Sequence, residues 1–209
     1  MEINMTKIKL CGLSRPCDIE TVNRLMPDYI GFVFAPKSKR YIPPQTAEKL
    51  KDMLDPRIQA AGVFVNEDPG VVADLLNSGI IDIAQLHGSE DPDYAARLRR
   101  LTKKKLFRAF KISKPEDIET VRTFPADQIL LDAGAGTGTV FDWNLIKDVE
   151  RPYFLAGGLN CENVADAIKT LKPYGVDVSS GIETDGLKDS ARMAAFVVAV
   201  RAADTEVTL

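Results

Sequence analysis

Tyr29-Ile30-Gly31-Phe32-Val33-Phe34 and Ala60-Ala61-Gly62-Val63-Phe64-Val65 are two short runs without a charged residue. Neither run alternates apolar and polar side chains, as a strand with one solvated face does. Continuous runs of this kind are typical of strands in a parallel sheet, which is covered on both faces. These two stretches decide the fold class, because the rest of the chain repeats their pattern.

Six further apolar runs occur, at residues 8–13, 83–86, 106–112, 128–132, 153–156 and 176–178. Successive runs start about 20 to 30 residues apart, the length of one strand and one helix. Helical patterns are expected between them, at residues 18–25, 46–53, 69–76, 92–101, 115–124, 162–171 and 189–203. Asp18 and Thr46 are the expected caps of the first two helices. Several others open near proline, whose missing N–H costs nothing in a first turn.

Alternating strands and helices imply an α/β protein with a parallel sheet, either a closed barrel or an open doubly wound sheet. Eight near-regular units favour a compact (β/α)8 barrel. An open sheet would carry a ligand crevice where the strand order reverses, often marked by G-x-G-x-x-G. No such motif follows the first run, and Gly134, Gly136 and Gly138 match it weakly. We therefore expect one (β/α)8-barrel catalytic domain over residues 1–209.

Composition restricts the classes of partner. The chain has 27 basic and 30 acidic residues and a formal net charge of −3, which does not favour nucleic acid. The first residues are charged, unlike a secretory signal, and no run approaches the ~20 apolar residues of a membrane span. Three cysteines and one histidine predict neither a disulfide framework nor a zinc site. We therefore expect a cytoplasmic protein.

One basic cluster stands out, formed by Arg99-Arg100 and Lys103-Lys104-Lys105. It is typical of the solvated carboxyl end of a helix, where cations are favoured. A partner that meets this cluster stays possible from the sequence. The sequence also does not distinguish a monomer from a homodimer.

The informative positions in such a barrel are the carboxyl ends of the strands, where active sites lie. Cys11, followed by Gly12, ends the first run, and Asp132 ends the sixth. A cysteine there is either a small buried residue or a base or nucleophile with a matched pKa. Asp132 is either a loop or cap carboxylate or a reacting group, since burial of an unpaired carboxylate is costly. The residues alone leave both alternatives open.

Glycine and serine follow the last two runs, as Gly157-Gly158 and Ser180-Gly181. Exposed backbone N–H groups at helix N-termini bind anions, and these two loops usually bind phosphate in this fold. We predict a phosphate site there, with simple turn glycines as the alternative. Arg40, in the loop after the second run, suits a carboxylate through its planar fork. His87 is expected to be a hydrogen-bonded structural residue.

Ten short motifs follow one another from about residue 7 to about residue 189. They are Lys9-Leu10-Cys11-Gly12-Leu13, Gly31-Phe32-Val33-Phe34, Ser38-Lys39-Arg40-Tyr41, Gly62-Val63-Phe64-Val65-Asn66, Gln85-Leu86-His87-Gly88, Leu131-Asp132, Gly136-Thr137-Gly138, Phe141-Asp142-Trp143, Gly157-Gly158-Leu159-Asn160 and Val176-Asp177-Val178-Ser179-Ser180-Gly181. Each is short, but together, in this order and at barrel spacing, they are specific. The chain resembles the phosphoribosylanthranilate isomerases, which catalyse the third step of tryptophan biosynthesis.

The resemblance implies a cofactor-free Amadori rearrangement of N-(5-phosphoribosyl)anthranilate to 1-(2-carboxyphenylamino)-1-deoxyribulose 5-phosphate. It implies that Asp132 is the general acid that opens the furanose ring and that Cys11 is the general base that takes the C2′ proton. It also implies that Arg40 binds the anthranilate carboxylate, and that Asp177 contacts the sugar or orders the site. The residues implied to bind phosphate through their backbones are Gly157, Gly158, Ser180 and Gly181.

Some positions depart from the family pattern. Leu10 is a mild hydrophobic replacement, and Thr139-Val140 replace a usual Lys-Thr pair, which leaves the role of that loop open. Ala156 removes a hydroxyl, so phosphate binding is expected to rest on backbone donors, while Cys161 is expected to be incidental. A sugar-phosphate isomerase of histidine biosynthesis is a rival identification, but Cys11 stands where such enzymes carry a carboxylate. A barrel without activity would have lost Cys11 or Asp132.

Overall fold

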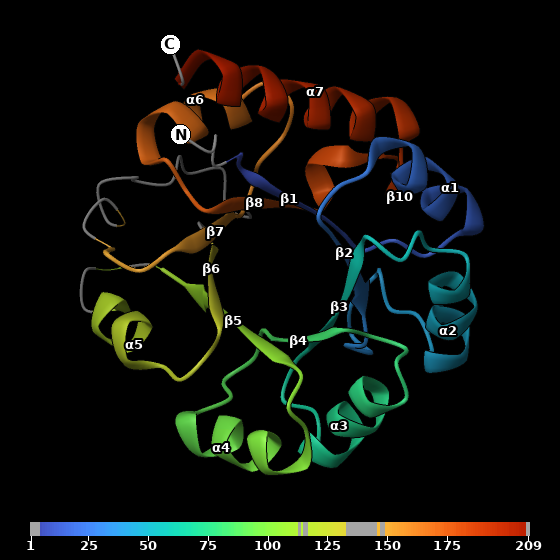
Figure 1. The fold of residues 1–209 in the computed structure, drawn as a ribbon, viewed down its shortest axis with the longest axis vertical. Helices are drawn as coiled ribbons and strands as arrows, with labels where there is room; N and C mark the ends of the chain where they lie inside the picture. Colours follow the sequence, from blue (N-terminus) through green and yellow to red (C-terminus); the bar gives the residue numbers. More distant parts are fainter. Residues whose placement is uncertain (1–4, 113, 115–116, 133–145, 147–148, 208–209) are drawn as a thin grey trace.

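Eight parallel strands close into a barrel in the computed structural model, which describes residues 5–112, 114, 117–132, 146 and 149–207. Each strand pairs with the next along the chain, and the last pairs with the first (Figure 1). The strands are β1 (Lys7–Cys11), β2 (Tyr29–Val33), β3 (Gln59–Phe64), β4 (Ile83–Leu86), β5 (Lys105–Lys111), β6 (Gln128–Asp132), β7 (Tyr153–Ala156) and β8 (Gly175–Val178). The predicted (β/α)8 barrel is confirmed, with a strand in each of the eight runs.

Helices form the outer layer around the barrel (Figure 1). They are α1 (Pro16–Leu25), α2 (Pro44–Asp52), α3 (Pro69–Asn77), α4 (Pro92–Leu101), α5 (Asp117–Thr123), α6 (Val164–Leu171) and α7 (Ser190–Val207). Asp68 and Asp91 cap α3 and α4 by accepting hydrogen bonds from Gly70 N and Tyr94 N, at 2.8 and 2.7 Å. Such caps satisfy backbone donors that have no partner within the helix.

Two helices begin earlier than the sequence predicts, in each case because proline sets the first turn. Helix α1 begins at Pro16, and Asp18 lies in its first turn, where it accepts hydrogen bonds from the backbone N–H groups of Ser14 and Arg15. Helix α2 begins at Pro44, so the cap residue is Pro43 and not Thr46 as expected. Proline suits these positions because its φ is already helical.

The lower part of the barrel interior is filled by aromatic rings. The ring centroids of Phe107 and Phe154 lie 5.8 and 5.6 Å from that of Tyr29, in edge-on contact. Gly175 makes room for them, since a Cβ there would lie 2.4 Å from Phe154 Cε1. This packed layer closes the barrel from below, so that any ligand must enter at the carboxyl ends of the strands.

A hairpin that the sequence analysis did not predict follows β8. The chain passes through a short 3-10 helix, η2 (Ser180–Ile182), into strands β9 (Glu183–Thr184) and β10 (Leu187–Lys188). Asp185 and Gly186 form the turn with φ of 52° and 78°. Two-residue hairpin turns with positive φ at both positions favour Asp-Gly, so the sequence did carry this signal.

The first and last elements are tied together. Thr6 Oγ1 donates to Asp204 Oδ1 at 2.5 Å, and Arg201 Nη1 donates to the Thr6 carbonyl at 2.7 Å. These contacts fasten helix α7 to the start of β1. No helix among the described residues is both long and apolar enough to cross a membrane.

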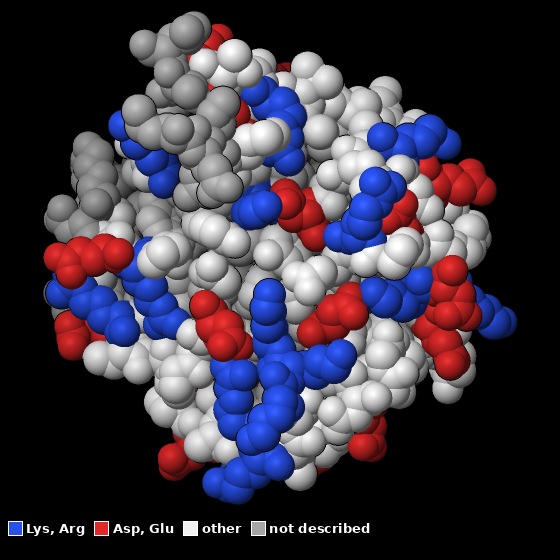
Figure 2. Space-filling view, in the orientation of Figure 1, with Lys and Arg blue, Asp and Glu red and all other residues white. Residues whose placement is uncertain are grey.

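Lys and Arg side chains gather over α4 and the start of β5 on the face seen in Figure 2. Arg99 and Arg100 lie in the last turn of α4, as predicted. Arg99 pairs with Asp127 at 2.6 Å and donates to the Lys104 carbonyl at 3.2 Å. Arg99 and Arg100 therefore lie where the dipole of a helix favours cations.

Candidate active site

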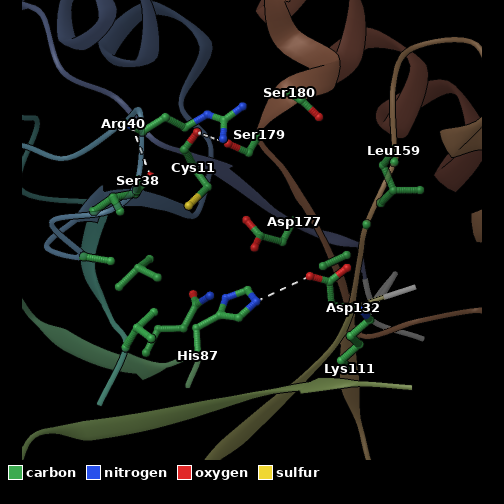
Figure 3. A pocket seen from close by; sticks show the side chains of 18 residues that line it. Cys11, Ser38, Arg40, His87, Lys111, Asp132, Leu159, Asp177, Ser179 and Ser180 are labelled. Carbon is green, nitrogen blue, oxygen red and sulfur yellow. Dashed lines mark hydrogen bonds and ion pairs between the residues drawn. The ribbon is translucent and has the colours of Figure 1, made fainter. Parts of the chain in front are cut away.

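A pocket of about 490 Å³ opens at the carboxyl ends of the strands. Figure 3 shows Cys11 and Asp132 on different sides of it, with Asp177 between them. The predicted site residues that line the pocket are Cys11, Arg40, Asp132, Gly157, Gly158, Asp177 and Ser180. The structure thus brings together residues from strands and loops far apart in the chain. Gly136-Thr137-Gly138, Phe141-Asp142-Trp143 and Thr139-Val140 lie outside the described residues.

Cys11 ends β1 beside Gly31 of β2. A Cβ on Gly31 would lie 2.5 Å from Cys11 Sγ, so this glycine makes room for the thiol. Only 8% of Cys11 is exposed, and burial raises the pKa of its thiol. Lys9 and Lys188 oppose that rise, whereas Asp177 adds to it. On balance, the pKa of the Cys11 thiol lies above its ordinary value.

Asp177 and Lys9 form an ion pair below Cys11. Lys9 on β1 is paired in register with Asp177 on β8, and Lys9 Nζ lies 2.8 Å from Asp177 Oδ1. Lys9 is fully buried, and Asp177 is 8% exposed. Burial alone would lower the pKa of Lys9, but Asp177 and Cys11 raise it above its ordinary value. The ammonium is therefore charged inside the barrel.

Asp132 ends β6 and faces His87, which follows β4. His87 Nε2 lies 3.4 Å from Asp132 Oδ2, and both side chains are partly exposed to the pocket. The loop that carries His87 is held by Glu90, which accepts hydrogen bonds from the N–H groups of Asn66 and Gly88 at 2.7 and 2.8 Å. Arg108 forms an ion pair with Glu90 at 3.2 Å, and this pair anchors the loop that carries His87.

Arg40 lies at the rim, where Glu183 from the hairpin engages its guanidinium. Arg40 Nε donates to Glu183 Oε1 at 2.5 Å and Nη2 donates to Oε2 at 2.7 Å. This is the bidentate geometry that arginine forms with a carboxylate. Nη1 has no hydrogen-bond partner among the described residues and can serve a second anion.

Lys188 holds Glu183 from the other side. Its Nζ lies 2.6 Å from Glu183 Oε1 and donates to the Ser179 carbonyl at 2.8 Å. Burial alone would raise the pKa of Glu183, but the hydrogen bonds from Arg40 and Lys188 lower it below its ordinary value. Gly12 permits this arrangement: its φ is +83°, and a Cβ there would lie 2.5 Å from Arg40 Cδ.

The two loops predicted to bind phosphate meet at the pocket wall. Gly157 and Gly158 have φ of 89° and 65°, and their N–H groups have no partner in the described part of the chain. Asn163 Nδ2 donates to the Gly158 carbonyl at 3.0 Å and fixes this loop. Unpaired backbone donors that project before a helix suit an anion.

Gly181 does not line the pocket. A Cβ at this position would lie 1.9 Å from the Leu159 carbonyl oxygen, so the glycine lets the seventh and eighth loops touch. It shapes the predicted phosphate site from behind.

Lys9, Glu183 and Lys188 are members of the site that the sequence analysis missed. Lysine and glutamate usually lie in solvent, and nothing local marks Lys9 and Lys188 as buried or Glu183 as half-buried. A signal existed for the last two, since they flank the Asp-Gly turn of the hairpin. Within the described ranges, no three His, Cys, Asp or Glu side chains lie close enough to hold a metal ion.

Comparison with known proteins adds independent findings. The family model described as N-(5'phosphoribosyl)anthranilate (PRA) isomerase matches residues 8–199. The N-(5'-phosphoribosyl)anthranilate isomerase of Acetivibrio thermocellus is 44% identical, over 96% of this chain and 98% of the relative. The crystal structure of phosphoribosyl anthranilate isomerase from Thermotoga maritima superposes with a TM-score of 0.86 at 35% identity, covering 95% of this chain and 100% of that one. A crystal structure of a phosphoribosyl anthranilate isomerase in complex with reduced 1-(o-carboxyphenylamino)-1-deoxyribulose 5-phosphate has a TM-score of 0.85 at 35% identity, with coverage of 95% of this chain and 100% of that one.

Proposed function

The chain belongs to the N-(5'-phosphoribosyl)anthranilate isomerase family, and on that premise we propose that Cys11 and Asp132 are the base and acid of its reaction. The function is the Amadori rearrangement of N-(5'-phosphoribosyl)anthranilate in tryptophan biosynthesis. The proposal concerns which residues carry out this reaction.

The observation that carries the assignment is the placement of Cys11 and Asp132 on different sides of one pocket (Figure 3). The reaction moves protons at two different atoms of one sugar, which calls for an acid and a base at two positions around it. Strands β1 and β6 supply that separation. A substrate held between them would present its ring oxygen to one residue and its C2′ to the other.

The proposed sequence begins with Asp132 in its protonated form. Asp132 gives its proton to the furanose ring oxygen while the bond between that oxygen and C1′ breaks, leaving an iminium at C1′. The iminium acidifies the C2′ proton, which Cys11 takes as a thiolate, and the electron pair neutralises the iminium to an enolamine. The enolamine then tautomerises to the ketone. Asp132 ends ionised and Cys11 ends as a thiol, and both are reset by proton exchange with solvent.

Binding is assigned to the groups around this pair. Arg40 has Nη1 directed to no described partner, which supports a contact with the anthranilate carboxylate while Glu183 holds the other side of the fork. Backbone N–H groups of Gly157, Gly158 and Ser180 would bind the phosphate, with Gly181 behind them. Asp177, already paired with Lys9, would order the pocket floor beneath the sugar.

The proposed setting follows from the substrate. Its phosphate and carboxylate charges prevent passage through hydrocarbon, so the enzyme is placed in the cytoplasm with the pathway that makes and uses these compounds. Residues 1–209 are proposed to act as one catalytic domain.

We expect Cys11→Ala and Asp132→Asn each to lower kcat by roughly 10²–10⁴-fold, the usual contribution of a general acid or base. The measurement is the decrease of anthranilate-adduct fluorescence as the purified enzyme consumes its substrate. Both variants should still fold and bind phosphate. Cys161→Ala is the matched control, since this cysteine does not line the pocket. Near-normal turnover in either pocket variant would refute the acid and base roles.

A further inference from the structure

The proposed mechanism needs a thiolate at a place where burial favours the thiol. Cys11 is 8% exposed and is packed among Val33 and Val63, which offer no hydrogen bonds. An isolated thiolate there would be costly. Proton loss from Cys11 therefore requires a nearby cation that stabilises the thiolate, and β1 itself carries one.

Lys9 is two residues before Cys11 on β1, so both side chains point into the barrel. Its stem passes through the core, and no part of the residue is exposed. Its ammonium contacts Asp177 Oδ1 at 2.8 Å, and its positive charge favours the ionised form of the Cys11 side chain two residues along the same strand. A fully buried lysine is rare unless it is paired or used.

Charges around the thiol do not balance while it is protonated. In the described chain the groups that act on it directly are Lys9 from β1, Asp177 from β8, Lys188 from β10 and Arg40 from the loop after β2. Glu183 from β9 pairs with the last two. Three cations thus face two carboxylates. A thiolate at Cys11 supplies the missing negative charge, and Lys9 is the cation on its own strand.

We propose that Lys9 is a positioning residue for the base: its buried ammonium holds Asp177 in place and stabilises the Cys11 thiolate that takes the substrate proton. Lys9 touches no reacting atom. It acts through Cys11 and Asp177. This assignment rests on the proposed role of Cys11 as the base, but it makes a claim about the free enzyme that does not need turnover.

An electrostatic role of Lys9 and a merely structural role predict different directions for the shift in the pKa of Cys11. Lys9→Met keeps the length of the side chain and removes the charge, leaving Asp177 alone beside the thiol, so the pKa of Cys11 should rise. Asp177→Asn removes the opposing charge and leaves Lys9 to the thiol, so the pKa of Cys11 should fall. General disruption of the pocket would shift both variants in the same direction.

The experiment measures the rate of iodoacetamide alkylation against pH in a Cys17→Ser/Cys161→Ser background, where Cys11 is the one remaining cysteine of the three in the chain. Thiolate is the reacting form, so the midpoint reports the pKa of Cys11. We expect alkylation at a fixed pH below the midpoint to slow by about tenfold or more in Lys9→Met, a shift of one pKa unit, and to accelerate in Asp177→Asn.

Lys7→Met is the matched control. Lys7 also lies on β1 with the same direction, but it pairs with Asp28 at 2.7 Å at the opposite end of the strand. Its loss should leave the alkylation midpoint unchanged. Circular dichroism checks the fold of each variant. If Lys9→Met does not fold, Asp177→Asn and the double variant Lys9→Met/Asp177→Asn carry the test. The alkylation midpoint of the double variant is then expected at a higher pH than that of Asp177→Asn.

An unchanged midpoint in Lys9→Met, or shifts of the same sign in Lys9→Met and Asp177→Asn, overturns the inference. Its failure can be told from failure of the proposed function. Normal turnover of Cys11→Ala refutes the base itself, whereas an inactive Cys11→Ala together with an unmoved thiol midpoint in Lys9→Met refutes the role of Lys9 alone.

Discussion

Arg40 meets a carboxylate of its own chain before any substrate arrives. Glu183 occupies Nε and Nη2 of its guanidinium, so the fork is fixed at the pocket rim in the unbound state. Ordering the side chain in advance lowers the entropy lost when a ligand binds. The pair is therefore interpreted as preparation of Arg40, with Nη1 left for the incoming anion.

Arg40→Ala should raise KM by about 10- to 100-fold, the worth of one or two hydrogen bonds to a charged group, with a smaller effect on kcat. Initial rates over a range of substrate concentrations give the two constants separately. Arg40→Lys keeps the charge but lacks the planar fork, so it should restore only part of the loss. An unchanged KM in Arg40→Ala would contradict binding of the anthranilate carboxylate.

Which site residues could be predicted follows from where they stand in the chain. Cys11 and Asp132 each end an apolar run, so their position at the pocket was predictable, and the family resemblance supplied their roles. Lys9 stands inside such a run and looks like a charged interruption. Its burial depends on Asp177, 168 residues away, and no local pattern expresses a contact at that distance.

The short β9–β10 hairpin positions side chains at the rim of the pocket. Its two strands bring Glu183 and Lys188 to Arg40 and Ser179, and its turn depends on the positive φ of Gly186. A Cβ on Gly186 would meet no atom within 4 Å. Any effect of a substitution there comes from the backbone conformation and not from a steric clash.

Gly186→Val should loosen the hairpin, because a branched residue at positive φ costs about 1–3 kcal/mol. We expect KM to rise several-fold while kcat changes less. Gly79→Val is the control: Gly79 has φ of +83°, open space around its Cα, and a place after α3, away from the pocket. Both should lower Tm similarly in thermal melts. A KM increase in Gly79→Val as well would point to global destabilisation.

At the level of elements, the sequence predicted every barrel strand and each α-helix that the structure describes, but not all of their ends and not the short helix η2. The strands were predictable because a strand buried on both faces leaves an unbroken apolar run. Ends were less certain where proline competed with a polar cap, as at Pro43 and Thr46. The hairpin was missed because two-residue strands have no periodicity to detect.

The stability of the whole molecule should depend on pH at the alkaline side. Burial raises the pKa of Tyr153 to about 12, and burial also raises the pKa values of Tyr29 and Tyr94. The unfolded chain loses these protons near pH 10, before the folded chain does. Their stabilising effect is complete below about pH 10 and is lost as the pH rises through the folded pKa.

Urea unfolding midpoints should therefore fall steeply between about pH 10 and 12. Tyr153→Phe removes one of the titrating groups, so its free energy of unfolding should decline less over that range, by on the order of 1–2 kcal/mol. Among the described residues, the hydroxyl of Tyr153 makes one hydrogen bond, a long one of 3.4 Å to the Leu171 carbonyl, so little is lost at neutral pH. Parallel curves for the two proteins would contradict this account.

The contacts of Thr6 with Asp204 and Arg201 make the folded chain nearly a ring. The strands succeed one another around the barrel in sequence order, and the eighth returns to the first. The cyclic order of Cys11, Asp132 and Asp177 around the pocket is therefore independent of where the chain starts. A circularly permuted chain, with its two ends in another loop, should therefore place the same groups around the same pocket.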